Sequence, residues 1–463
     1  MGKSLKQGML SVLVANIVNL GFSLLSNFLL PKYLSVETYA QLKTFQLYAT
    51  YAGLLHLGFV DGLYLKYGGK NIADYKPDTI EASLSTLRLF QLVITCGAVA
   101  IGVLLKDTIL VAFGISILPA NMMSCFKFLY QAVGEFDVYS RVINGTTISY
   151  FILNMIFVFI LKTDNPYFYI SVYIVVDVVL WISLEFLLHR KYKIAFQGIK
   201  FSLQELINNI KTGVLLTLGN LSSTFLTGMD RWFIKALMES SVPFAQYSFA
   251  VSMENFMNVA VTPVTVTLYN YFCREKEHEK IRKMRNSIQV FAAFIITCAF
   301  PAKFILENYL TKYIASVSVM FYLFGAQLFY IVIKSVYVNL YKATKRQREY
   351  FIKIVMVIFI GAALNAICYY LYQQKEAFAI GTLLSAIIWW ILCSRDHQSI
   401  GYSFKEILFM LVIEFGYQIC GNLMGAIPGM LVYLIFAVCM SFLLLKDDFF
   451  YLLKNGKSML LRR

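Results

Sequence analysis

The run GMLSVLVANIVNLGFSLLSNFLL, residues 8–30, decides the class of fold. It is longer than the about 20 residues that a helix needs to cross the hydrocarbon core of a bilayer. It is also too long for the apolar part of a signal peptide. We therefore expect a first membrane span that is retained in the mature chain, preceded by the cations Lys3 and Lys6.

Similar apolar runs follow along the whole chain. Hydrophobic residues make up 59% of the 463 residues and charged residues only 14%, whereas soluble domains are about half apolar and a quarter charged. No soluble domain interrupts the series. The sequence predicts an all-α, polytopic membrane protein with about fourteen transmembrane helices, at residues 8–30, 40–62, 83–105, 107–132, 142–161, 167–188, 212–236, 244–271, 288–306, 315–341, 350–372, 376–393, 405–423 and 426–445.

The basic residues are distributed unevenly between the loops. Of the 41 Lys and Arg residues, those in the odd-numbered loops are Lys32, Lys106, Lys162, Lys312 and Lys375. Because cytoplasmic loops are enriched in Lys and Arg, we expect the even-numbered loops and both termini in the cytoplasm, with the chain in the cytoplasmic (inner) membrane. Basic residues placed in this way are topology signals, so the net charge of +15 does not indicate a nucleic-acid-binding face.

A polar connector divides the chain into two halves. The segment from about His189 to Lys211 carries spaced apolar residues, which indicates a short amphipathic helix at the membrane interface. The apolar residues are Phe201, Leu203, Leu206 and Ile207. We expect a bundle of six plus six plus two helices: an N-terminal lobe at 1–200, a second lobe at 201–395, and an additional hairpin with a cytoplasmic tail at 396–463.

Two expected spans carry matching stripes of polar residues. Each stripe runs i, i+3, i+7, i+11 and so lies on one face of a helix. The stripes superimpose at an offset of 204 residues, and they are Asn16, Asn19, Ser23 and Asn27 in the first span and Asn220, Ser223, Thr227 and Arg231 in the seventh. Both halves begin in the cytoplasm, so the repeat is parallel. We interpret the stripes as facing a substrate cavity between two lobes, with hydrogen bonding between helices as the open alternative.

Ionisable residues inside the expected spans are the other polar signal. Each costs about 3 kcal/mol or more at a helix centre, so it marks an interior face. Arg231 and Lys334 lie deep and favour an anionic substrate, unless they pair with Asp230 or Glu254. Carboxylates suit a coupling proton or sodium ion, and the candidates are Asp61, Asp230 and Glu254. Further ionisable residues within or near the ends of spans are Lys43, Lys127, Asp177, Glu185, Lys235 and Glu414.

The start of the chain resembles a known family. The segments that carry the likeness are 28–35 (FLLPKYLS), 37–41 (ETYAQ), 57–59 (LGF) and 61–62 (DG). They look like the polysaccharide transport family, the Wzx-type flippases, which share the multidrug/oligosaccharidyl-lipid/polysaccharide exporter (MOP) superfamily with the multidrug and toxin extrusion (MATE) proteins. The resemblance implies a MATE-like two-lobed bundle that moves a polyprenyl-pyrophosphate-linked oligosaccharide, as in O-antigen, capsule or exopolysaccharide synthesis, by alternating access. It also implies the lipid bilayer, in some members a coupling ion, and glycan-assembly proteins as partners.

Other functions remain to be weighed. A MATE-type drug or cation exporter would share the fold, but Arg231 and Lys334 argue against a cationic substrate. Polytopic glycan enzymes carry their chemistry in long external loops, and no such loop occurs here, so we expect no enzyme. A scaffold for envelope assembly would leave the matched stripes without a purpose. The eight cysteines show no metal-ligand spacing, and we expect neither a metal nor another cofactor.

Overall fold

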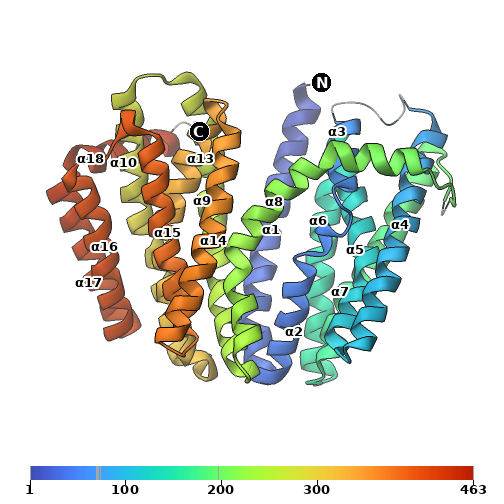
Figure 1. The fold of residues 1–463 in the computed structure, drawn as a ribbon, viewed down its shortest axis with the longest axis horizontal. Coiled ribbons are helices and arrows are strands. Elements are labelled where there is room, and N and C mark those ends of the chain that lie inside the picture. Colours follow the sequence, from blue (N-terminus) through green and yellow to red (C-terminus); the bar gives the residue numbers. More distant parts are fainter. Residues whose placement is uncertain (1, 69–71, 73–74, 197, 462–463) are drawn as a thin grey trace. The chain divides into compact units, whose positions relative to one another are not determined.

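The computed structural model is almost entirely helical (Figure 1), and it describes residues 2–68, 72, 75–196 and 198–461. The chain divides into two compact units, Met1–Thr224 and Phe225–Arg463. Long helices are what this composition dictates, because a backbone in lipid must satisfy its polar groups within its own segment.

In the residues that the structure describes, the first unit holds seven α-helices and most of an eighth. Its longest helices run from one end of the unit to the other, as membrane spans require. The helices are α1 (Gly2–Tyr33), α2 (Val36–Ala49), α3 (Phe59–Tyr67), α4 (Pro77–Leu104), α5 (Thr108–Ala132), α6 (Phe136–Met155), α7 (Pro166–Tyr192) and α8 (Leu203–Leu237), whose last turns belong to the second unit.

The second unit contains the remaining helices. A 3-10 turn at Ile296–Cys298 joins α10 to α11, and a π-helical turn at Ile333–Tyr337 joins α12 to α13, so each pair forms one span. The helices are α9 (Ser241–Arg274), α10 (His278–Ile295), α11 (Ala299–Asn308), α12 (Val317–Val332), α13 (Val338–Ala343), α14 (Gln347–Leu371), α15 (Glu376–Asp396), α16 (Phe404–Leu423), α17 (Ala426–Leu444) and α18 (Lys446–Leu461).

The expected membrane character is confirmed by the helices. Within the described ranges, ten helices are long and apolar enough to cross a membrane, from Pro77–Leu104 to Ala426–Leu444. The protein is therefore an all-α, polytopic membrane protein. The four other expected spans lie in α1, α8, α9 and the pair α2–α3, so the count of fourteen crossings stays a prediction.

The expected second span, 40–62, is not one continuous helix. Helix α2 ends at Ala49, a short 3-10 turn covers Ala52–Leu54, and α3 begins at Phe59. The backbone is left-handed at Leu57 (φ 52°) and Gly58 (φ 92°), a conformation that ends a helix and favours glycine. Gly58 is needed for a second reason, because a Cβ there would lie 2.6 Å from the backbone nitrogen of Val214 in α8.

The connector between the halves is also different from expectation. The amphipathic segment is not a separate helix but forms the first turns of α8, which lie across the first unit beside α3 in Figure 1. Glycines allow this close approach: a Cβ on Gly62 would lie 2.1 Å from the Asn209 carbonyl oxygen, and a Cβ on Gly213 would lie 2.0 Å from the Gly58 carbonyl oxygen. The start of α8 is thereby packed backbone against backbone onto α3.

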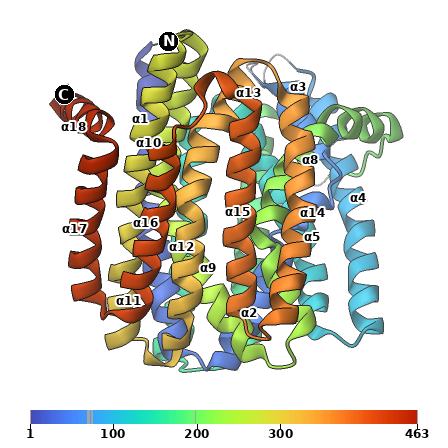
Figure 2. The ribbon, with the colours of Figure 1, turned by 60° about the vertical axis from the view of Figure 1, so that its left-hand side comes forward.

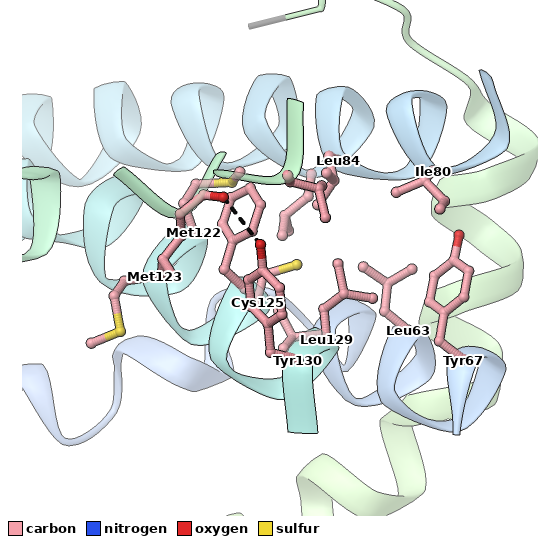
Figure 3. Packing of buried hydrophobic residues seen from close by; sticks show 14 of the residues in the cluster. Leu63, Tyr67, Ile80, Leu84, Met122, Met123, Cys125, Leu129 and Tyr130 are labelled. Atoms are coloured by element: carbon pink, nitrogen blue, oxygen red, sulfur yellow. Dashed lines mark hydrogen bonds between the residues drawn. The ribbon is translucent and has the colours of Figure 1, made fainter. Parts of the chain in front are cut away.

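An apolar core holds the first unit together (Figure 3). Side chains from α3, α4, α5 and α7 meet in one cluster, in which the buried Leu63, Leu84 and Leu129 lie near one another. The Tyr130 hydroxyl donates a hydrogen bond to the Leu184 carbonyl oxygen at 3.3 Å. This core holds α3 against α4, α5 and α7.

The C-terminal hairpin α16–α17 is part of the second unit (Figure 2). The fully buried Arg285 of α10 binds Glu406 of α16, with 2.8 Å between Nη2 and Oε2. At the opposite end, Lys303 of α11 donates to the carbonyl oxygen of Gly421 at 2.7 Å and to that of Met424. A positive side chain there satisfies the free carbonyls of the α16 C-terminus, so both ends of α16 are attached to the preceding helices.

Candidate functional site

The polar stripe of α1 faces its neighbours within the first unit. Asn16 is exposed, whereas Asn19, Ser23 and Asn27 are half-buried. The Ser23 hydroxyl donates to Asn19 Oδ1 at 3.0 Å, and the same oxygen accepts a hydrogen bond from Thr147 of α6 at 3.1 Å. The middle of this stripe therefore joins two helices, as the alternative interpretation expected.

The last member of the stripe holds a buried cation. Lys43 of α2 is only 8% exposed, and its Nζ donates to Asn27 Oδ1 at 3.3 Å. The same ammonium lies 5.2 Å from the centroid of the Tyr39 ring, which adds a cation–π contact. Lys43 is thus engaged inside the unit and does not only extend to the interface.

Sequence reasoning missed a polar network close to this stripe. The Tyr150 hydroxyl of α6 donates to Asp177 Oδ1 of α7 at 2.8 Å, and Gln46 Nε2 of α2 donates to the Tyr173 hydroxyl of α7 at 2.6 Å. The charge of Lys127 in α5 also acts on Asp177. Asp177 and Lys127 were visible as ionisable residues in spans, but nothing in the sequence indicated their partners.

The first of the candidate carboxylates, Asp61, lies where α3 meets α8. It is buried and accepts a hydrogen bond from the Thr217 hydroxyl of α8. Asp61 belongs to the first unit, whereas Asp230 and Glu254 belong to the second. The structure therefore does not place the three carboxylates in one cluster within a unit.

The stripe of α8 can be followed in part. The side chains of Asn220 and Ser223 lie outside the described residues, and Thr227 is exposed. Arg231 is half-buried, and its Nε is a buried donor with no hydrogen-bond acceptor among the described residues. The stripe thus ends in an arginine whose hydrogen-bonding capacity is not fully used.

Next to Arg231 lies a buried carboxylate with partners of its own. Asp230 is 4% exposed; it accepts a hydrogen bond from the Arg231 backbone N–H at 2.8 Å and another from the Tyr247 hydroxyl of α9. These hydrogen bonds offset much of the free-energy cost of burying the carboxylate. Asp230 is therefore held without a cationic side chain bonded to it.

Glu254 and Lys334 complete this region of the second unit. Glu254 of α9 accepts a hydrogen bond from Gln327 of α12. The Lys334 ammonium lies 5.4 Å from the centroid of the Tyr330 ring. The charges of Asp230, Lys334 and Arg231 all act on the Glu254 carboxyl, so the four ionisable groups share one electrostatic neighbourhood.

The sequence left open that Arg231 or Lys334 forms a structural ion pair with Asp230 or Glu254. In the described part of the chain, neither Arg231 nor Lys334 forms an ion pair with Asp230 or Glu254. Both cations lie within electrostatic reach of Glu254 without a direct ion pair in the described residues, and each carboxylate accepts a hydrogen bond from a neutral donor. The arrangement suits a phosphate group bound by Arg and Lys. The described residues contain no cluster of three His, Cys, Asp or Glu side chains placed to hold a metal ion.

The fold is similar to that of known transporters. The lipid II flippase MurJ in an inward closed conformation superposes with a TM-score of 0.57 at 12% identity, covering 94% of this chain and 98% of that chain. An inward-facing MATE family transporter of the MOP superfamily gives a TM-score of 0.56 at 15% identity, covering 83% of this chain and 95% of that one. A MATE structure in complex with MaL6 gives 0.54 at 12% identity, covering 86% and 96%.

No protein-family model matches the sequence, and no curated protein matches it. At these identities the likeness shows the fold alone. The chain has a fold similar to that of a lipid II flippase and of a MATE family transporter. The expected fold class is confirmed, and the expected resemblance is confirmed only as a similarity of fold to these transporters.

Proposed function

We propose that the protein is a flippase that carries a polyprenyl-pyrophosphate-linked oligosaccharide across the cytoplasmic membrane by alternating access. The observation that carries the proposal is the pair of basic side chains, Arg231 and Lys334, that form no ion pair with the nearby carboxylates. Unpaired cations are costly inside a membrane, and a pyrophosphate would compensate for both. The similar fold of a lipid II flippase across 94% of this chain supports the same reading.

The proposed binding residues are those of the two stripes together with Lys334. Their amides and hydroxyls would hydrogen-bond sugar hydroxyls, and Arg231 and Lys334 would bind the pyrophosphate. The substrate would be a repeat unit of O-antigen, capsule or exopolysaccharide. The set is Asn16, Asn19, Ser23, Asn27, Asn220, Ser223, Thr227, Arg231 and Lys334.

For ion coupling we propose a carboxylate that binds a proton or sodium ion. Glu254 is the first candidate, because it shares the neighbourhood of Arg231 and Lys334, so its charge state would change their hold on an anion. Asp230 is the second, and Asp61 is a third that would act from the first unit. We also propose that the basic loops and both termini face the cytoplasm, with a lobe at 1–200, a lobe at 201–395 and a hairpin and tail at 396–463.

A MATE-type exporter of cationic drugs is the second candidate function. It is favoured by the nearly equal TM-score of a MATE family transporter, 0.56 against 0.57 for the flippase, and by the carboxylates Asp230 and Glu254. A cationic substrate would have to be bound beside Arg231 and Lys334, which would repel it. We therefore rank this function second.

Binding to the purified full chain separates the two functions. We expect a polyprenyl pyrophosphate to bind and a lipophilic cation such as ethidium not to compete with it. Arg231→Glu should abolish binding of the pyrophosphate, whereas Arg348→Glu, at an exposed position of α14, should leave it unchanged. Tight ethidium binding that Arg231→Glu strengthens would instead support the exporter.

A further inference from the structure

A groove on the first unit, separate from the residues discussed above, lies between α6 and α7. Its volume is about 310 Å³. Val138, Arg141 and Val142 of α6 line one side, and six residues of α7 between Leu180 and Arg190 line the other. Most of the lining is apolar, and its basic side chains are Arg141 and Arg190.

Along α7 the groove follows one face of the helix. Leu180, Ser183, Leu187 and Arg190 are spaced i, i+3, i+7, i+10, which places them in one row. Ten residues of helix rise about 15 Å, which is half of the hydrocarbon core of about 30 Å. The groove therefore extends from the basic end of α7 to roughly the depth of one leaflet.

The two arginines lie at the end of the groove that carries the basic loops. Arg141 is in the second turn of α6 and Arg190 in the last turn of α7, and both are exposed. Neither guanidinium has a hydrogen bond or an ion pair with another residue in the described ranges. Both are therefore available for a phosphate, which Arg can bind with two parallel hydrogen bonds.

The half-buried carboxylate of Glu135 does not compete for these arginines. Glu135 Oε1, just before α6, accepts hydrogen bonds from Lys191 Nζ at 2.5 Å and from the Tyr192 hydroxyl at 2.8 Å. Burial raises the pKa of Glu135, but these two bonds and the Lys191 charge outweigh it and hold the pKa below its usual range. The exposed Asp137 lies one turn before Arg141 without forming an ion pair with it. The local charge at the mouth of the groove remains basic.

We propose that this groove binds an anionic phospholipid of the cytoplasmic leaflet, with its phosphate between Arg141 and Arg190 and one acyl chain along α7. The apolar walls match an acyl chain, the length matches one leaflet, and the paired cations match a phosphate. Val142 and Leu184 are buried and form the floor, while the exposed Phe186 and Leu187 form the rim toward lipid. The site rests on the proposed orientation of the basic loops and is independent of the transported substrate.

Native mass spectrometry of the full chain, titrated with phosphatidylglycerol or phosphatidylcholine, tests this site. We expect one phosphatidylglycerol to bind at least about tenfold more tightly than phosphatidylcholine. The double variant Arg141→Gln/Arg190→Gln should lose this preference. The control Arg348→Gln/Arg395→Gln removes two exposed arginines at the basic ends of the neighbouring helices α14 and α15 and should keep it.

A second variant distinguishes a built site from general attraction to basic residues. Ser183→Phe fills the groove without changing the charge and should weaken phosphatidylglycerol binding as strongly as the double variant, with an unchanged melting temperature. Full binding by Ser183→Phe would overturn the proposal. Two other results would also overturn it. One is displacement of phosphatidylglycerol by an equal or lower concentration of polyprenyl phosphate, and the other is a helical partner protein that co-purifies in a 1:1 ratio and occupies the groove.

Discussion

Helices α1 and α8 carry polar residues at matching positions, but these residues differ in the hydrogen bonds that they form with neighbouring helices. In α1, Asn19 bonds Thr147 and Asn27 bonds Lys43, so the stripe is used inside the first unit. In α8, Arg231 occupies the position that corresponds to Asn27, and its Nε has no acceptor in the described structure. The shared spacing of polar residues thus predicts that they lie on one face of each helix. Whether that face stabilises the unit or can bind a ligand depends on the hydrogen-bond partners that the neighbouring helices supply.

The largest expected effect on stability comes from a change at the start of α8, where this helix packs onto α3. Gly213→Ala places a Cβ 2.0 Å from the Gly58 carbonyl oxygen, so the backbones must separate. We expect a loss of several kcal/mol in the free energy of unfolding, seen as a large drop in melting temperature. The matched control is Gly219→Ala in the same helix, where a Cβ meets nothing within 4 Å; equal effects of the two changes would contradict the tight packing of α3 and α8.

The next effect compares the two equivalent stripe positions directly. Arg231→Ala should lower transport on the order of 100-fold, because a phosphate would lose its charged partner. The melting temperature should change little, because no described residue depends on the Arg231 side chain for an ion pair. Transport into proteoliposomes and a thermal melt of the same preparation measure both quantities.

Asn27→Ala should show the opposite profile. Lys43 loses the acceptor at 3.3 Å, and a hydrogen bond to a charged group contributes about 1.5–3 kcal/mol. We expect a lower melting temperature and a smaller loss of transport than in Arg231→Ala, because the Asn27 amide oxygen already accepts a hydrogen bond from Lys43. The comparison between α1 and α8 fails if Asn27→Ala impairs transport as severely as Arg231→Ala in a protein of unchanged stability.

The smallest effect concerns the carboxylates. Glu254→Gln removes a charge while keeping an oxygen for Gln327, so binding of substrate should persist and the dependence of transport on the ion gradient should fall several-fold. Asp61→Asn keeps an acceptor for Thr217 in the first unit and should lower that dependence less than Glu254→Gln does. Transport measured with and without an imposed gradient decides between them, and a full gradient response in Glu254→Gln would exclude its coupling role.

The sequence predicted those features that depend on local pattern. Apolar length predicted the helices, and the spacing of Asn19, Ser23 and Asn27 predicted a common face. The break before α3 had a weaker signal: Gly58 and Gly62 are one turn apart, a spacing that often marks close helix contact. Its cause, the backbone of Val214 in α8, is too distant in sequence to infer.

The hydrogen-bond partners were beyond local pattern for the same reason. Thr147 lies 128 residues from Asn19, and Tyr173 lies 127 residues from Gln46. Nothing in the spacing of either residue points to the other. The same limit applied to Arg231 and Lys334, for which pairing with Asp230 or Glu254 and availability for a ligand were equally compatible with the sequence.

The central claim, that the chain flips a lipid-linked oligosaccharide, is tested most directly in cells that lack it. Lipid-linked sugars extracted after deletion should contain an accumulated oligosaccharide that stays on the cytoplasmic face of the membrane. The parent chain should clear it, and the Arg231→Glu variant, present in the membrane at the parent level, should not. A normal lipid-linked pool with normal glycan export in the deleted cells would contradict the account.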